Sequence, residues 1–186
     1  ASDVYKRQTP PRRTIEMLEE SGVTHVVGIP DNTSGPLFLA LREHPSIRLV
    51  TVTREGEAFA LASGLWLGGA EPLVVVQNTG LLESGDAIRG TAMRMGAGVP
   101  VVVTGRGYAK MRAAEITPDQ PRDRALLVRP DVDSTALLTE PTLEAWGIPF
   151  SVCEGDDDPV ATILGTVRQA RSEERPVAAV VARGLD

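Results

Sequence analysis

LVVVQ at residues 73–77 and VPVVVT at residues 99–104 are the two stretches that decide the fold. Each is apolar up to a polar last residue, so neither shows the alternation of a half-exposed strand. Parallel strands covered by helices on both faces have this pattern, whereas strands with one face in water do not. The two stretches therefore predict central strands of a parallel sheet.

Strand-like and helical segments alternate along the rest of the chain. We expect strands at 24–29, 47–53, 72–77, 99–105, 150–154 and 176–182, and helices at 11–21, 37–44, 54–69, 84–96, 134–146 and 159–172. This alternation predicts an α/β fold, a doubly wound open sheet of about six parallel strands. Residues 105–131 lack periodicity and predict a long loop with one short helix, a kind of segment that is often functional.

Composition narrows the classes of function. The 186 residues fit one domain, and we expect it to span residues 9–186 after an extraneous or disordered leader at 1–8. The net charge of −6 argues against nucleic acid or an anionic membrane as partner. A single cysteine and two isolated histidines predict no disulfide and no zinc site, and no segment resembles a membrane span, so we expect a cytoplasmic protein.

The residues that follow the strands are the candidates for chemistry, because ligands of open parallel sheets bind outside the carboxyl ends of the strands. Four junctions have suitable residues, and we expect them to meet at one edge of the sheet. They read Gly28-Ile29-Pro30-Asp31-Asn32, Thr53-Arg54-Glu55-Gly56, Gln77-Asn78-Thr79-Gly80 and Gly105-Arg106-Gly107.

Glu55 is the most informative of these residues. It opens a helix whose continuation, AFALASGLWLGG, is apolar on almost every side, and such a helix must be buried. In a small domain the natural cover for its outer face is another chain, which would place Glu55 at a protein interface. The alternative is a structural carboxylate favoured by the helix dipole, and Glu57 is expected to be structural or interfacial.

Two successive amides, Gln77 and Asn78, end a central apolar strand, where they are costly unless they bind something. We expect one of them to face a pocket, although both can instead satisfy the backbone of a turn. Thr79 and Gly80 would let the backbone approach a ligand, a weaker indication because glycine also serves ordinary turns.

Together these motifs resemble the thiamine-diphosphate decarboxylases that act on sulfopyruvate and phosphonopyruvate. The resemblance covers nearly the whole chain after the leader, through GIPD at 28–31, EGEAFALASG at 55–64, QNTGL at 77–81, the Arg106-Gly107 pair and PVAAVV at 176–181. It implies the pyrimidine-binding domain of such an enzyme. It also implies cofactor contacts from the residues at the strand ends, namely Pro30, Asp31, Glu55, Gln77, Asn78, Thr79 and Gly80.

The resemblance assigns catalysis to Glu55, whose family counterpart hydrogen-bonds N1′ of the aminopyrimidine. A carboxyl group in apolar surroundings can stay protonated near neutral pH, and so favour the tautomer whose 4′ nitrogen takes the proton from the thiazolium ring. The family pattern Gln-Asn-Ser-Gly-Leu-Gly-Asn differs here at Thr79, Leu82 and Glu83, which leaves the substrate open. Weaker candidates for a substrate anion are Asn32, Arg54 and Arg106, with Arg89 a further candidate by position.

The diphosphate half of such an enzyme is not recognisable in these 186 residues. The family's Gly-Asp-Gly segment with a later asparagine has one look-alike, at Gly155-Asp156-Asp157-Asp158, which reads better as an acidic helix cap. We therefore expect an alpha subunit that self-associates and needs a beta subunit carrying magnesium and the cofactor's diphosphate. Two alternatives remain: a catalytically silent domain of the same fold acting as a binding or regulatory module, and an unrelated flavodoxin-like or Rossmann-like binding protein.

Overall fold

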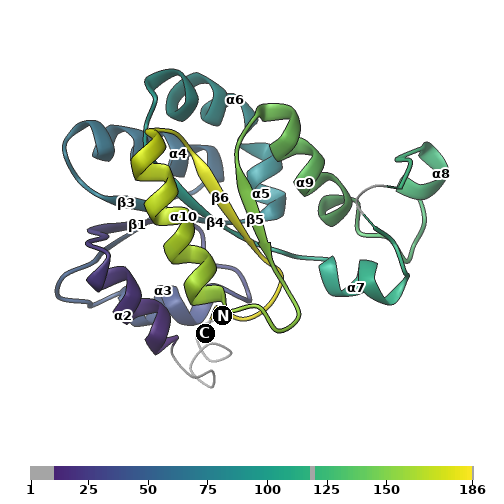
Figure 1. The fold of residues 1–186 in the computed structure, drawn as a ribbon, viewed down its shortest axis with the longest axis horizontal. Helices are drawn as coiled ribbons and strands as arrows, with labels where there is room; N and C mark the ends of the chain where they lie inside the picture. Colours follow the sequence, from purple (N-terminus) through teal and green to yellow (C-terminus); the bar gives the residue numbers. More distant parts are fainter. Residues whose placement is uncertain (1–10, 118–119, 186) are drawn as a thin grey trace.

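The sheet consists of six parallel strands in the order β2-β1-β3-β4-β6-β5 in the computed structural model, which describes residues 11–117 and 120–185 (Figure 1). The predicted fold class is confirmed. The predicted leader, residues 1–8, lies outside the described residues. The strands are β1 (His25–Gly28), β2 (Arg48–Thr51), β3 (Pro72–Gln77), β4 (Pro100–Thr104), β5 (Phe150–Cys153) and β6 (Val177–Val181).

Helices cover both faces of this sheet (Figure 1). One face is covered chiefly by α2 (Arg12–Glu20), α3 (Gly35–Leu41) and α10 (Pro159–Glu173). The other is covered chiefly by α4 (Glu55–Leu67), α5 (Asn78–Glu83), the π-helix η1 (Ile88–Met93) and α9 (Ser134–Trp146), with α6 (Gly85–Ala87) between α5 and η1.

Alternate residues of each central strand enter two separate cores. In β3, Val74 and Val76 pack with α4 and α9, whereas Leu73 and Val75 pack with α2, α3 and α10. All four side chains are buried, since a helix layer lies on each face. This double covering explains why the strand sequence shows no polar alternation.

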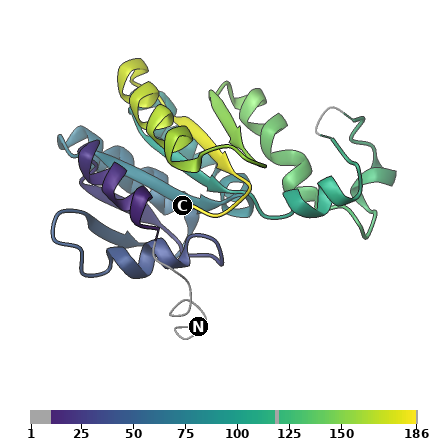
Figure 2. The ribbon, with the colours of Figure 1, turned by 60° about the horizontal axis from the view of Figure 1, so that its bottom comes forward.

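Two predicted segments differ from the structure. The helix expected at 84–96 is preceded by α5, which begins at Asn78 directly after β3, so Thr79 and Gly80 are helical rather than part of a turn. The segment 105–131 contains two short helices, α7 (Tyr108–Ala113) and α8 (Arg124–Leu127), where one was expected. Figure 2 shows both extending to one side of the sheet. Among the described residues no helix combines the length and apolar character needed to cross a membrane.

Candidate active site at the carboxyl edge of the sheet

The four predicted junctions meet at one edge of the sheet. Gly28 is in register with Thr51 of β2 and with Val75 of β3, and Gln77 is in register with Thr104 of β4. All these strands run in the same direction, so the residues that follow them leave from the same side. The prediction that the four junctions meet at one edge of the sheet is therefore confirmed.

Gly28 brings the end of β1 unusually close to β3. A Cβ atom at this position would overlap the carbonyl oxygen of Val75. Because that obstacle is backbone, a side chain here would force the two strands apart. The absence of a side chain at Gly28 thus permits this close approach of the two strands.

Asp31, in that loop, joins three strand ends. Its Oδ1 accepts hydrogen bonds from the Thr33 amide (2.9 Å), the Ser34 amide (2.7 Å) and the Ser34 hydroxyl (2.8 Å). Its Oδ2 accepts from Gln77 Nε2 (3.1 Å) and from the Thr104 hydroxyl. Burial by itself would raise the pKa of Asp31, but the hydrogen bonds from Thr104, Ser34 and Gln77 together lower it. Asp31 is therefore an ionised carboxylate whose oxygens are both engaged within the chain.

Glu55 is the first residue of α4, and its half-buried side chain lies against α5. A Cβ atom at Gly80 would overlap Cγ, Cδ and Oε1 of Glu55, so glycine at this position is what leaves room for the carboxyl group. Glu57, two residues later, accepts hydrogen bonds from the amides of Thr53 (3.0 Å) and Arg54 (3.3 Å). These bonds cap the helix, which agrees with the structural one of the two roles predicted for Glu57.

The two amides that end β3 have different surroundings. Asn78 is fully buried, and its Nδ2 donates to the Arg106 carbonyl (2.9 Å) and to Thr139 Oγ1 (3.2 Å). Gln77 is only partly buried, and its Oε1 accepts from the Thr79 hydroxyl (3.1 Å). Gln77, not Asn78, is thus the amide with a side chain open to the edge of the sheet.

The weaker candidates Asn32, Arg54 and Arg106 lie in the junctions that follow the strands. Arg89 does not, because it lies in η1 and lines a hollow with Trp146, the last residue of α9. Pro30 and Asn32 are exposed, on either side of Asp31. Arg54 pairs with Glu83, whose other oxygen accepts from the Gly56 amide (3.4 Å). The two remaining arginines are also in ion pairs, Arg89 with Asp86 and Arg106 with Asp133.

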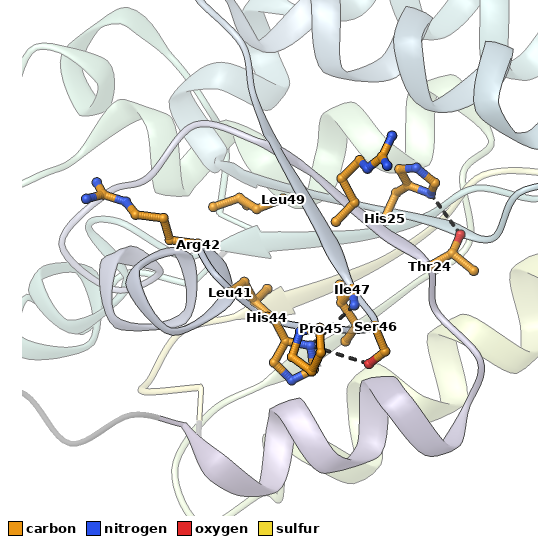
Figure 3. Close-up of a pocket in the computed structure, with 10 residues that line it drawn as sticks. Thr24, His25, Leu41, Arg42, His44, Pro45, Ser46, Ile47 and Leu49 are labelled. Carbon is orange, nitrogen blue, oxygen red and sulfur yellow. Dashed lines mark hydrogen bonds between the residues drawn. The ribbon is translucent and has the colours of Figure 1, made fainter.

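A separate cavity of about 480 Å³ lies at the opposite edge, where β1 and β2 begin (Figure 3). It is lined by Thr24, His25, Leu41, Arg42, His44, Pro45, Ser46, Ile47, Arg48 and Leu49. Burial and the nearby charge of Arg48 lower the pKa of His25. No residue of the predicted site lines this cavity, so we assign the chemistry to the carboxyl edge, where the polar groups converge.

Comparison with known proteins identifies the fold family. Residues 12–120 match the thiamine pyrophosphate enzyme family, N-terminal TPP-binding domain. The chain belongs to this family. Thiamine pyrophosphate is the cofactor otherwise called thiamine diphosphate, so the predicted family and cofactor class are confirmed.

Several decarboxylases are similar to this TPP-binding domain. Phosphonopyruvate decarboxylase of Streptomyces viridochromogenes is 41% identical over 82 residues, which are 44% of this chain and 20% of that protein. Sulfopyruvate decarboxylase subunit alpha of Methanococcus maripaludis is 27% identical over 99 residues, 53% of this chain and 59% of that subunit. The chain thus spans less than two thirds of either curated relative.

A solved structure confirms the fold. The thiamine diphosphate-dependent 4-hydroxybenzoylformate decarboxylase of Rhodococcus jostii RHA1 superposes with a TM-score of 0.59 at 20% identity, over 94% of this chain and 30% of that one.

The polar groups at the carboxyl edge suit one end of the cofactor. A carboxyl group such as that of Glu55 and an amide such as that of Gln77 can form hydrogen bonds with the ring nitrogens and amino group of an aminopyrimidine, whereas the Thr79 hydroxyl already donates its proton to Gln77 Oε1. Magnesium and diphosphate require clustered oxygen ligands. Residues 11–117 and 120–185 contain no group of three or more histidine, cysteine, aspartate or glutamate side chains placed to hold a metal ion. Asp156 and Asp157 do not form such a site, and Asp158 caps α10 through the Val160 amide (3.1 Å).

Proposed function

We propose that this chain is the pyrimidine-binding half of a two-chain, thiamine-diphosphate-dependent 2-oxo acid decarboxylase of the sulfopyruvate or phosphonopyruvate type. One observation carries the proposal: in a member of this family, the Glu55 carboxyl group lies at the carboxyl edge of the sheet in a space that Gly80 leaves free. A glutamate that served only as a helix cap would not need this space, because Glu57 already caps α4.

Glu55 is the proposed catalytic residue. When bound, thiamine diphosphate supplies the electron sink that decarboxylation requires. Glu55 would hold a proton at N1′ of the aminopyrimidine and thereby favour the tautomer that can accept a proton at the 4′ nitrogen. Gln77 and Thr79 would line the pyrimidine site beside it, and Gly80 would keep the Glu55 side chain in place.

The other predicted contacts have different proposed roles. Pro30 and Asp31 would form the wall after β1. Asn78 is buried, so it would not contact the cofactor directly. It would instead hold the Arg106 carbonyl group in position through its hydrogen bond. Asn32 and Arg106 remain proposed as substrate contacts, because both follow strand ends and both are exposed.

A partner subunit is proposed to supply magnesium and the diphosphate site. Two findings support it: the described residues offer no cluster of metal ligands, and relatives from Methanococcus maripaludis and Methanocaldococcus jannaschii are named alpha subunits. The cofactor would then lie between the two chains, and activity would require both.

The proposed contact surface includes the outer face of α4, which accounts for its apolar sequence. Leu61 is 39% exposed and Leu67 is 59% exposed, although the opposite side of the helix packs on the sheet. Met93 and Met95, in and just after the neighbouring η1, are also exposed. We propose that this α4–η1 surface packs against a second copy of the chain, while the carboxyl edge faces the partner subunit.

Calorimetric titration of thiamine diphosphate with magnesium tests the proposal, with this chain alone and mixed with the partner subunit. We expect binding and 2-oxo acid decarboxylation only in the mixture. Glu55→Gln should abolish decarboxylation, whereas Glu57→Gln should cost stability but leave turnover in the folded protein. A folded, associated pair that binds no cofactor would favour a catalytically silent module instead.

A further inference from the structure

We propose that Asp31 is a positioning residue that fixes the orientation of the Gln77 amide, so that Gln77 presents an N–H donor to the carboxylate of a 2-oxo acid. The choice of ligand rests on the proposed function. The orientation of the amide does not, because it follows from hydrogen bonds within this chain.

The Asp31 carboxylate dictates which end of the Gln77 amide faces it. An ionised carboxylate has acceptors only, so the group 3.1 Å from Oδ2 must be the Nε2 donor and not the amide oxygen. The reverse orientation would place two acceptors against each other. Thr104 and Ser34 bind the same carboxylate, so Asp31 has no room to turn away.

The other end of the amide agrees with this orientation. Gln77 Oε1 accepts from the Thr79 hydroxyl at 3.1 Å, so the only proton of that hydroxyl is used. The hydrogen bonds thus run in one direction, from Thr79 to Gln77 and from Gln77 to Asp31. Each donor and acceptor in this series is compatible with its neighbour.

One donor of Gln77 is left over. The Nε2 atom has two N–H groups, and within the described ranges Asp31 is its only acceptor. Gln77 is partly exposed at the edge where Glu55 lies, so its second N–H is available to a ligand. The carboxylate and ketone oxygens of a 2-oxo acid are acceptors only, and an N–H donor held in a fixed orientation suits them.

Nuclear magnetic resonance of the chain alone tests the orientation without any cofactor. We expect a scalar coupling across the hydrogen bond between Gln77 Nε2 and the Asp31 carboxyl carbon, and one slowly exchanging Nε2 proton. Asp31→Asn should remove the slow exchange, while Asp156→Asn, at an exposed aspartate, should not. A wild-type Gln77 amide whose two protons exchange rapidly, with no coupling, would overturn the assignment even if Asp31→Asn failed to fold.

A double-mutant cycle in the assembled enzyme tests whether Asp31 acts through Gln77. We expect Asp31→Asn and Gln77→Ala each to raise KM for the 2-oxo acid about tenfold with little change in kcat, as for loss of one hydrogen bond to a charged group. In the Gln77→Ala background, Asp31→Asn should raise KM no further. Equal effects in both backgrounds would show that Asp31 acts on the fold in general. If no 2-oxo acid is turned over at all, the proposed function fails, and the resonance data still decide the orientation.

Discussion

Gly80→Ala tests the effect of the Glu55 position on activity separately from its effect on the stability of the fold. The added Cβ would overlap three side-chain atoms of Glu55 by about 1 Å relative to ordinary van der Waals contact, so the carboxyl group must move by at least that distance. A displacement of about 1 Å in a catalytic group costs roughly 100-fold in rate. We therefore expect kcat/KM of the assembled enzyme to fall about 100-fold.

The free energy of unfolding should change little in the same variant. Gly80 lies in α5, where alanine is favoured over glycine by about 1 kcal/mol. Turning the flexible Glu55 side chain away from its rotamer costs a similar amount, about 1 kcal/mol. Urea unfolding of the chain and steady-state kinetics of the enzyme measure the two effects separately. Gly165→Ala is the matched control, because Gly165 lies in α10 with open space around it. Wild-type kcat/KM in Gly80→Ala, or a loss fully explained by unfolding, would refute the reasoning.

Three further changes test the fold and its surfaces. Gly28→Ala should lower the free energy of unfolding by about 3 kcal/mol or more in a urea titration, because its Cβ meets the Val75 backbone; a change below about 1 kcal/mol would contradict the close approach. The folded-state pKa of Asp31 lies below its usual 3.8, so its ionisation stabilises the fold at neutral pH and this stabilisation is lost as the pH falls below about 3.8. Asp31→Asn should therefore have a lower free energy of unfolding than the wild type near pH 7, and that free energy should fall less on acidification. Urea unfolding at a series of pH values measures both effects, and an equal fall in the variant and the wild type below about pH 3.8 would contradict the prediction. Leu61→Lys should weaken self-association in analytical ultracentrifugation without lowering stability, whereas Leu39→Lys, at a leucine 37% exposed, should leave association unchanged.

The central strands were the most predictable part of the fold. The bounds of β3 and of α9 agree with the sequence prediction, because a long apolar run and a well-capped helix depend mainly on local pattern. The start of α5 at Asn78 was not predictable in this way, since Asn, Thr and Gly are poor helix formers. That helix forms where Leu81 enters the core and Gly80 accommodates Glu55, and both features depend on tertiary contacts. The short helices α7 and α8 are too short to show a helical period in the sequence.

The candidate site was predictable in location but not in its internal bonding. The prediction of a parallel sheet was enough to place Asp31, Glu55 and Gln77 at one edge, because the carboxyl ends of parallel strands lie on the same side. The sequence could not show that Asp31 bridges Gln77 and Thr104, since this depends on how the loop after β1 folds against the ends of β3 and β4. Nor could it show which of two adjacent amides is buried. Asn78 and Gln77 differ in surroundings only because the chain turns into a helix between them.

The charges at this edge bear on where a substrate's second anionic group is recognised. Arg54 and Arg106, the arginines at the strand ends, are paired with Glu83 and Asp133. Both guanidinium groups are exposed, although Asp133 is largely buried, and ion pairs at the surface contribute little to stability, about 0–1 kcal/mol. Pairing alone would therefore not prevent an arginine from turning to a ligand. A dianionic group would gain from either arginine only after the guanidinium turned away from its carboxylate, because the intact pair offers no net attraction. Gln77 can bind the 2-oxo acid carboxylate that all the candidate substrates share. We therefore expect the distinction between a sulfonate, a phosphonate and an uncharged substituent to depend mainly on the proposed partner subunit, with Arg106 contributing only when it is released from Asp133.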